Sequence, residues 1–192
     1  MVRFCLALAV GLSLGLAGNA ARADDPLADC LRAPLADDLA AKVAFQDALR
    51  DLIAVQRPDL GALASLNRDR QVTLAKARTI RLDWLAAADP DRLRPLSADG
   101  TPWRSFAWER EDEAALRDAD ARYTTVSIRA EALTRRSDGH PDWPALRAHM
   151  RTTLSGDDWF RTLVARGRDS AAATDAALRA CFGQQAPADA NQ

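Results

Sequence analysis

Residues 109–136 read EREDEAALRDADARYTTVSIRAEALTRR and carry the clearest structural signal in the chain. The apolar positions step by three or four residues: Leu116, Ala119, Tyr123, Val126, Ala130 and Leu133. This spacing places them on one face of an α-helix, as a seam between packed helices requires. The first turn, residues 109–113, is acid-rich and suits the positive end of a helix dipole. The stretch therefore predicts one continuous helix over about 109–135.

The same stretch carries acid–base pairs four residues apart with the acid first: Glu113–Arg117, Asp118–Arg122 and Glu131–Arg135. Pairs in this orientation stabilise a helix by about 0.3 kcal/mol each. They predict a solvated helix face rather than a binding stripe.

Helical spacing continues on both sides of this stretch, and no segment alternates like a strand. The spacing predicts helices over about 36–56 and 58–88, a short helix carrying Trp143 to Leu154, and a last helix that Asp157 caps and that extends to about Phe182. The predicted fold is all-α: an up-and-down bundle of four main helices plus one shorter helix. The link over about 89–107 is the one long connection, and a loop of that length is either functional or structured.

Two turns resemble each other. Asp99–Gly100–Thr101–Pro102 leads to Trp103, and Asp138–Gly139–His140–Pro141 leads, one residue later, to Trp143. Aspartate–glycine before proline is strong turn chemistry. The helix between the two turns separates them by roughly 40 Å at 1.5 Å per residue. We therefore expect two end caps rather than one shared pocket.

The N-terminus has the pattern of a secretory signal peptide over residues 1–23. Arg3 precedes an apolar run, and Ala21 and Ala23 stand at the −3 and −1 positions of a cleavage site. The run is shorter than the roughly 20 residues of a bilayer span. Cleavage after Ala20 and an uncleaved anchor are the alternatives. We expect residues 24–183 to form a single helical domain, residues 184–192 a disordered tail, and the product to be periplasmic or secreted without stable membrane insertion.

Signal removal changes the charge and the cysteine count. Loss of Arg3 and Arg22 leaves 24 of the 26 basic residues against 27 acidic ones, a net charge of −3, with the arginines dispersed along the chain. This balance does not favour nucleic acid or an anionic membrane as partner. Loss of Cys5 leaves Cys30 and Cys181. An even pair in an oxidising compartment predicts a disulfide that ties the two ends of the domain together.

Signatures of cofactor or catalytic chemistry are missing from the sequence. Asp138, His140, Asp142 and His149 fall short of the three or four convergent ligands of a zinc site, and His149 is expected on a helix surface. The sequence has no Gly-x-Ser-x-Gly elbow, no CxxCH haem motif, no P-loop and no glycine-rich dinucleotide fingerprint. We therefore predict neither a metal nor a cofactor.

One cluster is a candidate binding site: Trp103, Arg104, Phe106 and Trp108. Aromatic residues and arginine dominate interaction hot spots, although a cap on the core would recruit the same residues. The leading hypothesis is a non-catalytic interaction protein of the bacterial envelope that binds another protein, such as another envelope protein, or an envelope component. The alternative is an envelope enzyme or small-ligand binder, which requires a polar cavity between helices containing a carboxylate or His149.

Overall fold

The computed structural model describes residues 26–94 and 102–183, and every element within them is helical. The elements are α1 (Pro26–Gln56), η1 (Pro58–Leu60), α2 (Gly61–Ala88), η2 (Pro90–Leu93), α3 (Pro102–Ser105), α4 (Arg110–Ala119), α5 (Ala121–Asp138), α6 (Trp143–Thr152), η3 (Leu154–Gly156) and α7 (Asp158–Gly183). The all-α class is thereby confirmed for the described residues. The predicted signal peptide at 1–23 and tail at 184–192 lie outside them. No helix in the described ranges is long and apolar enough to cross a membrane.

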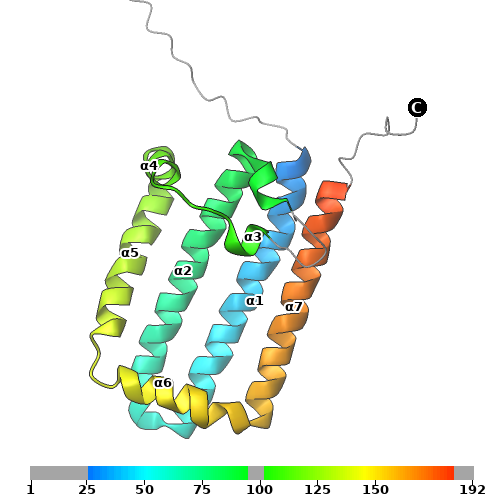
Figure 1. Cartoon of the computed structure of the whole chain (residues 1–192). Coiled ribbons are helices and arrows are strands. Elements are labelled where there is room, and N and C mark those ends of the chain that lie inside the picture. Colours follow the sequence, from blue (N-terminus) through cyan, green and yellow to red (C-terminus); the bar gives the residue numbers. More distant parts are fainter. Residues whose placement is uncertain (1–25, 95–101, 184–192) are drawn as a thin grey trace, which may run out of the picture.

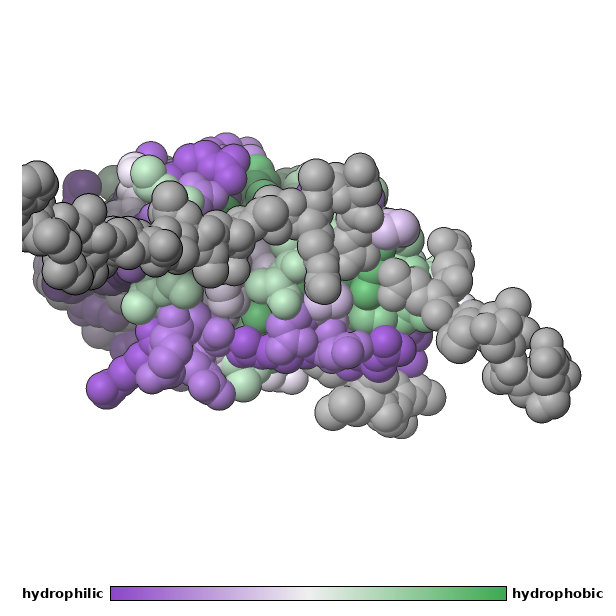
Figure 2. Space-filling view, turned by 90° about the horizontal axis from the view of Figure 1, so that it is seen from above, coloured by the Kyte–Doolittle hydropathy of each residue, from purple (hydrophilic) through white to green (hydrophobic). Residues whose placement is uncertain are grey.

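Four long helices lie side by side in the order α5, α2, α1, α7 (Figure 1). The chain runs down α1, up α2, down α5 and up α7, while α6 crosses the lower end and α3 and α4 lie near the upper end (Figure 1). Helix α2 packs between α1 and α5, and α1 also packs against α7. Seen from above, hydrophilic residues gather along two opposite edges of the upper end, with apolar residues between them (Figure 2).

Helix α1 begins at Pro26, ten residues before the predicted start at Ala36, so that boundary was wrong. Proline suits a first helical turn, where its missing N–H costs no hydrogen bond. The early turns are held by tertiary packing, since Leu27, Leu31 and Leu35 are all buried at helical spacing. The helix also continues through Pro34. Burial of this leucine stripe overrides the penalty of an internal proline, which is about 3 kcal/mol.

The predicted helix over 109–135 is two helices, because the chain breaks at Asp120. The backbone of Asp120 is extended (φ −134°, ψ 102°), and its side chain accepts hydrogen bonds from the amides of Arg122 and Tyr123. Aspartate is a preferred N-cap residue because it satisfies such orphan amides. The guanidinium of Arg122 also pairs with Asp120, at 2.7 Å, and not with Asp118 as predicted.

We expect Asp120→Ala to lower the free energy of unfolding by about 1 kcal/mol, because it leaves the first amides of α5 without a cap. The measurement is urea unfolding followed by circular dichroism. Asp118→Ala is the matched control: Asp118 is exposed and lies two residues away on α4, so we expect a change within about 0.5 kcal/mol. Equal losses in the two variants would contradict the capping role.

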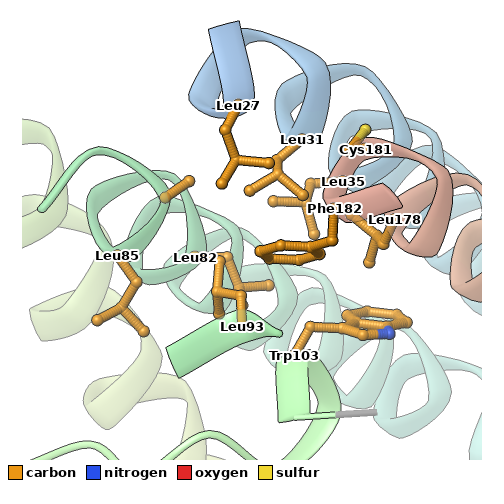
Figure 3. Close-up of a cluster of buried hydrophobic side chains, with 11 residues drawn as sticks. Leu27, Leu31, Leu35, Leu82, Leu85, Leu93, Trp103, Leu178, Cys181 and Phe182 are labelled. Carbon is orange, nitrogen blue, oxygen red and sulfur yellow. The ribbon is translucent and has the colours of Figure 1, made fainter. Parts of the chain in front are cut away.

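The described residues form three clusters of buried apolar side chains: one toward each end of the long helices, and a small one of Ala77, Leu116 and Tyr123 between α2, α4 and α5. The upper cluster joins α1, α2, η2, α3 and α7 through Leu27, Leu31, Leu35, Leu82, Leu85, Ala86, Leu93, Trp103, Leu178, Cys181 and Phe182 (Figure 3). Trp143 packs against a different cluster, which contains Leu146 of α6 and Leu154. The two tryptophans that follow the similar turns therefore lie in separate clusters, as the expectation of two caps requires.

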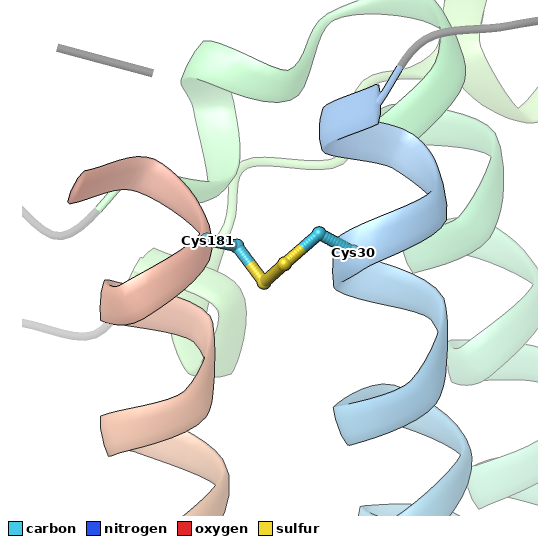
Figure 4. Close-up of a disulfide and its surroundings, with 2 residues drawn as sticks. All are labelled: Cys30 and Cys181. Carbon is cyan, nitrogen blue, oxygen red and sulfur yellow. A yellow bond between two sulfur atoms is a disulfide. The ribbon is translucent and has the colours of Figure 1, made fainter. Parts of the chain in front are cut away.

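The predicted disulfide is confirmed. Cys30 of α1 and Cys181 of α7 are bonded, with 5.7 Å between their Cα atoms (Figure 4). Cys181 belongs to the upper cluster, and Cys30 packs against it. The bond therefore joins the first turns of α1 to the last turns of α7 beside buried leucines.

Candidate functional site

Residues 102–119 form a strap that comprises α3, a short extended link and α4. Arginines of α2 hold it: Arg78 donates a hydrogen bond to the carbonyl of Trp103, and Arg81 pairs with Glu113 at 3.1 Å. Beyond α2, Arg92 pairs with Asp112 at 2.8 Å. The strap carries all four residues of the predicted binding cluster.

Trp103 is the buried anchor of the strap, with 2% of its surface exposed. Its indole N–H donates to Asp175 of α7 at 2.8 Å. The cationic groups of Lys42, Arg78 and Arg104 lie 5.1–5.8 Å from centroids of the indole. Contacts of cations with an indole face at this distance are attractive. Trp103 therefore fastens α3 to α1, α2 and α7.

The other three members of the cluster differ in exposure. Phe106 and Trp108 are partly buried and meet edge to face with ring centroids 6.0 Å apart. Arg104 is exposed and pairs with Asp175 at 2.9 Å. Binding of a partner by this cluster stays a prediction, and Arg104 is the one exposed member of the four.

Glu113 of α4 is the centre of a polar network that the sequence did not reveal. Its carboxylate accepts hydrogen bonds from Trp108 Nε1 at 2.7 Å, from the Tyr123 hydroxyl at 2.5 Å and from Arg117 Nε at 2.7 Å. Tyr123 in turn accepts a hydrogen bond from Arg81 Nε at 2.5 Å. The predicted pair of Glu113 with Arg117 is present, but Glu113 is only 25% exposed, so its predicted place on a solvated face was wrong: Trp108, Tyr123 and Arg81 close around the carboxylate.

Partial burial by itself would raise the pKa of Glu113. The hydrogen bonds from Tyr123, Arg117 and Trp108 act in the opposite direction, as does the charge of Arg81. These contributions outweigh the effect of burial and hold the pKa of Glu113 at about 2. Burial and the same carboxylate raise the pKa of Tyr123 to about 12. A carboxylate ionised at neutral pH and saturated with donors is poorly matched to proton transfer, which favours a pKa near the working pH. The network is suited to holding α4 and α5 on α2.

A cleft of about 330 Å³ lies beside this network, between α2, α4 and α5. Its apolar floor includes Leu74, Ala77 and Ala130, and Arg81, Glu113 and Arg117 supply polar groups. This Glu113 cleft has a carboxylate between helices, as the small-ligand alternative requires, but it is open to the surface and mostly apolar rather than an internal polar cavity.

A second depression, the α1–α7 groove, has a volume of about 400 Å³. Its apolar lining combines the ring of Phe45 on α1 with mostly small residues of α7: Val164, Gly167, Ala171 and Ala172. Its rim carries Arg104, Arg168 and Asp175. At Gly167 an added Cβ would lie 3.7 Å from the Phe45 ring, which is an ordinary van der Waals contact, so an alanine would fit at this position.

His149 is buried at 6% exposure, so its predicted position on a helix surface was wrong. Its Nε2 has no hydrogen-bond partner among the described residues. Burial lowers the pKa of this imidazole, and the nearby charge of Arg57 lowers it further. Within 26–94 and 102–183, no group of three or more histidine, cysteine or acidic residues is arranged to hold a metal ion.

Comparisons of the chain with protein-family models, with curated proteins and with solved structures find no match. Inference about function therefore rests on the geometry of the described residues. The sites that matter for it are the strap, the α1–α7 groove and the clefts that border α4.

Proposed function

We propose that the chain is an exported, non-catalytic interaction protein of the bacterial envelope, built on an up-and-down bundle of four long helices. Its partner is another envelope protein, which binds at the α1–α7 groove beside Arg104. The observation that carries the proposal is the composition of this groove: an apolar floor under a rim of two arginines and one aspartate.

The floor of the groove suits an apolar side chain of a partner. Gly167, Ala171 and Ala172 leave little bulk on α7, and Ala172 is exposed. Interface cores combine well-packed apolar contacts with arginine and aromatic anchors. The ring of Phe45 offers such an anchor from α1.

The rim of the groove favours an acidic segment on the partner. Arg104 and Arg168 supply two positive charges, whereas Asp175 supplies one negative charge. The Asp175 carboxylate is engaged by the Trp103 indole and by Arg104. The excess positive charge would attract a carboxylate and fix its register next to the apolar floor.

The Glu113 network supports a role without catalysis. A carboxylate held at a pKa of about 2 by four neighbours serves packing better than proton transfer. Small-ligand binding is the second candidate function. It is favoured by two clefts that border α4: the Glu113 cleft and a second one lined by Asp83, Leu116 and Arg122.

A photo-crosslinking residue in place of Ala172 is expected to capture a discrete envelope protein in living cells, identified by mass spectrometry. Ala172 lines the groove and is exposed. Combining this change with Arg104→Glu and Arg168→Glu should lower the yield of the adduct by about tenfold or more, because the rim then repels an acidic segment.

Ala177 is the matched control for this experiment. It is exposed on the same helix, five residues along, and does not line the groove. At 100° per residue the two positions face directions about 140° apart. Equal capture at both positions, or no adduct at Ala172, would contradict the proposed interface.

A further inference from the structure

A third depression, which shares no lining residue with the Glu113 cleft, has a volume of about 530 Å³. It is bounded by α1, α2 and the junction of α4 with α5. Its floor is apolar: Ile80, Trp84, Leu116 and Ala119. Its charged residues are Arg32, Asp83, Asp120 and Arg122, so two basic and two acidic groups balance. We call it the Asp83 cleft.

Asp120 is committed to the structure of the cleft wall. Its carboxylate caps α5 and pairs with Arg122, and these hydrogen bonds, the one from Arg122 first, lower its pKa. Arg122 uses Nε and one terminal nitrogen for this pair, and its side chain is 85% exposed. A guanidinium has five N–H donors, so donors remain on Arg122 for a ligand.

Of the two acidic residues that line the cleft, Asp83 is the one whose carboxylate has no hydrogen-bonding role in the fold. Among the described residues its carboxylate forms no hydrogen bond or ion pair, and Arg32 and Arg122 act on it through charge alone. Desolvation of the Asp83 carboxylate by neighbouring protein atoms raises its pKa. The positive charges of Arg32 and Arg122 offset part of this rise. A carboxylate with unused acceptor sites in a cleft is a candidate ligand-binding group.

We propose that the Asp83 cleft binds a short, uncharged saccharide whose hydroxyl groups meet Asp83 and Arg122 and whose apolar ring face lies on the floor at Trp84. The balanced charges give the cleft no net attraction for an ion. A purely apolar ligand would cover Asp83 without supplying a donor, which is costly. A pyranose hydroxyl both donates and accepts, and the sugar ring presents an apolar C–H face.

Trp84 is positioned for this role by the strap. Its ring meets Trp108 edge to face at 5.7 Å, and Trp108 is fixed in turn by its hydrogen bond to Glu113. An aromatic ring held in one orientation binds a ligand with less loss of side-chain entropy. The Asp83 cleft and the α1–α7 groove share no lining residue, so this inference is independent of the protein partner.

The test is a titration of the mature protein with chitotriose, maltotriose and cellotriose, followed by saturation-transfer NMR and tryptophan fluorescence. We expect at least one of these uncharged sugars to bind with a Kd of about 1 mM or tighter. Trigalacturonate serves as the charged probe and should bind more weakly than that sugar. Absence of binding by all three uncharged sugars, or tighter binding of trigalacturonate, would overturn the proposal.

Asp83→Ala should weaken binding of the sugar by about tenfold or more, since it removes a charged hydrogen-bond acceptor. Asp83 is exposed on α2, so alanine is compatible with the helix, and circular dichroism checks the fold. Asp51→Ala is the control: that residue is an exposed acid of α1 paired with Arg50, and it does not line the cleft. An unchanged Kd in Asp83→Ala would place the sugar elsewhere and refute the assignment.

Discussion

Loss of the Cys30–Cys181 bond is expected to lower the free energy of unfolding by about 5 kcal/mol. The bond closes a loop with a sequence separation of 151 residues. In the chain-entropy account, the cross-link stabilises the fold by restricting the unfolded chain, and the effect grows with the logarithm of the loop length. Typical domains are stable by about 5–15 kcal/mol, so the reduced protein should be marginal.

The measurement is urea unfolding of the oxidised protein, the reduced protein and the Cys30→Ala/Cys181→Ala double variant. Intact-mass analysis should show two thiols only after reduction. The reduced protein and the double variant serve as controls for each other, because both lack the cross-link. A double variant within about 1 kcal/mol of the oxidised protein would show that the packing of α1 on α7 suffices without the bond.

Glu113→Gln is expected to lower stability by about 3 kcal/mol at neutral pH. The native pKa of Glu113 is about 2, against an ordinary value of 4.5. A depressed pKa stabilises the folded state above the unfolded value, and this contribution disappears as the pH falls through the native value. Each unit of pKa difference corresponds to about 1.4 kcal/mol. The stability of the native protein should therefore fall between about pH 4.5 and pH 2.

The measurement is urea unfolding at a series of pH values from neutral to acid. Glu113→Gln should flatten the acid limb of that curve, because the titrating group is gone. Glu131→Gln is the matched control: Glu131 lines the same cleft and pairs with Arg117, but its side chain is 56% exposed. Exposed ion pairs contribute about 0–1 kcal/mol. An unaltered acid limb in Glu113→Gln would refute the role of Glu113 as the centre of the network.

The sequence predicts much of the fold because helical periodicity is a local property. The spacing of apolar residues over 58–88 and the cap at Asp157 agree with α2 and α7, where the Asp157 side chain accepts a hydrogen bond from the amide of Phe160 at 2.8 Å. The break at Asp120 was missed because the apolar stripe continues across it. The N-cap formed by Asp120 ends one helix and starts the next, although the spacing of apolar residues continues unchanged from α4 into α5.

The candidate sites were less accessible to sequence reasoning. Glu113 has an arginine four residues later, which is the usual signature of a solvated pair. Its burial depends on Arg81 and Tyr123, 32 and 10 positions away in the chain. Proximity of Trp108 was the available hint, since an indole N–H seeks an acceptor when buried. No pattern in the sequence indicated Asp83 as a candidate site residue, because its cleft arises from the packing of three segments that are separate in the chain.

The position of the disulfide sets an order of events while the chain is being made. The upper cluster needs residues from α1, α2, the strap and the last turns of α7. At synthesis rates of about 5–20 residues per second, Cys30 precedes its partner by roughly 8–30 s. During that interval the buried leucines of α1 lack their contacts with α7, and the thiol of Cys30 has no native partner. Closure of the domain is therefore a late event that depends on the arrival of its final helix.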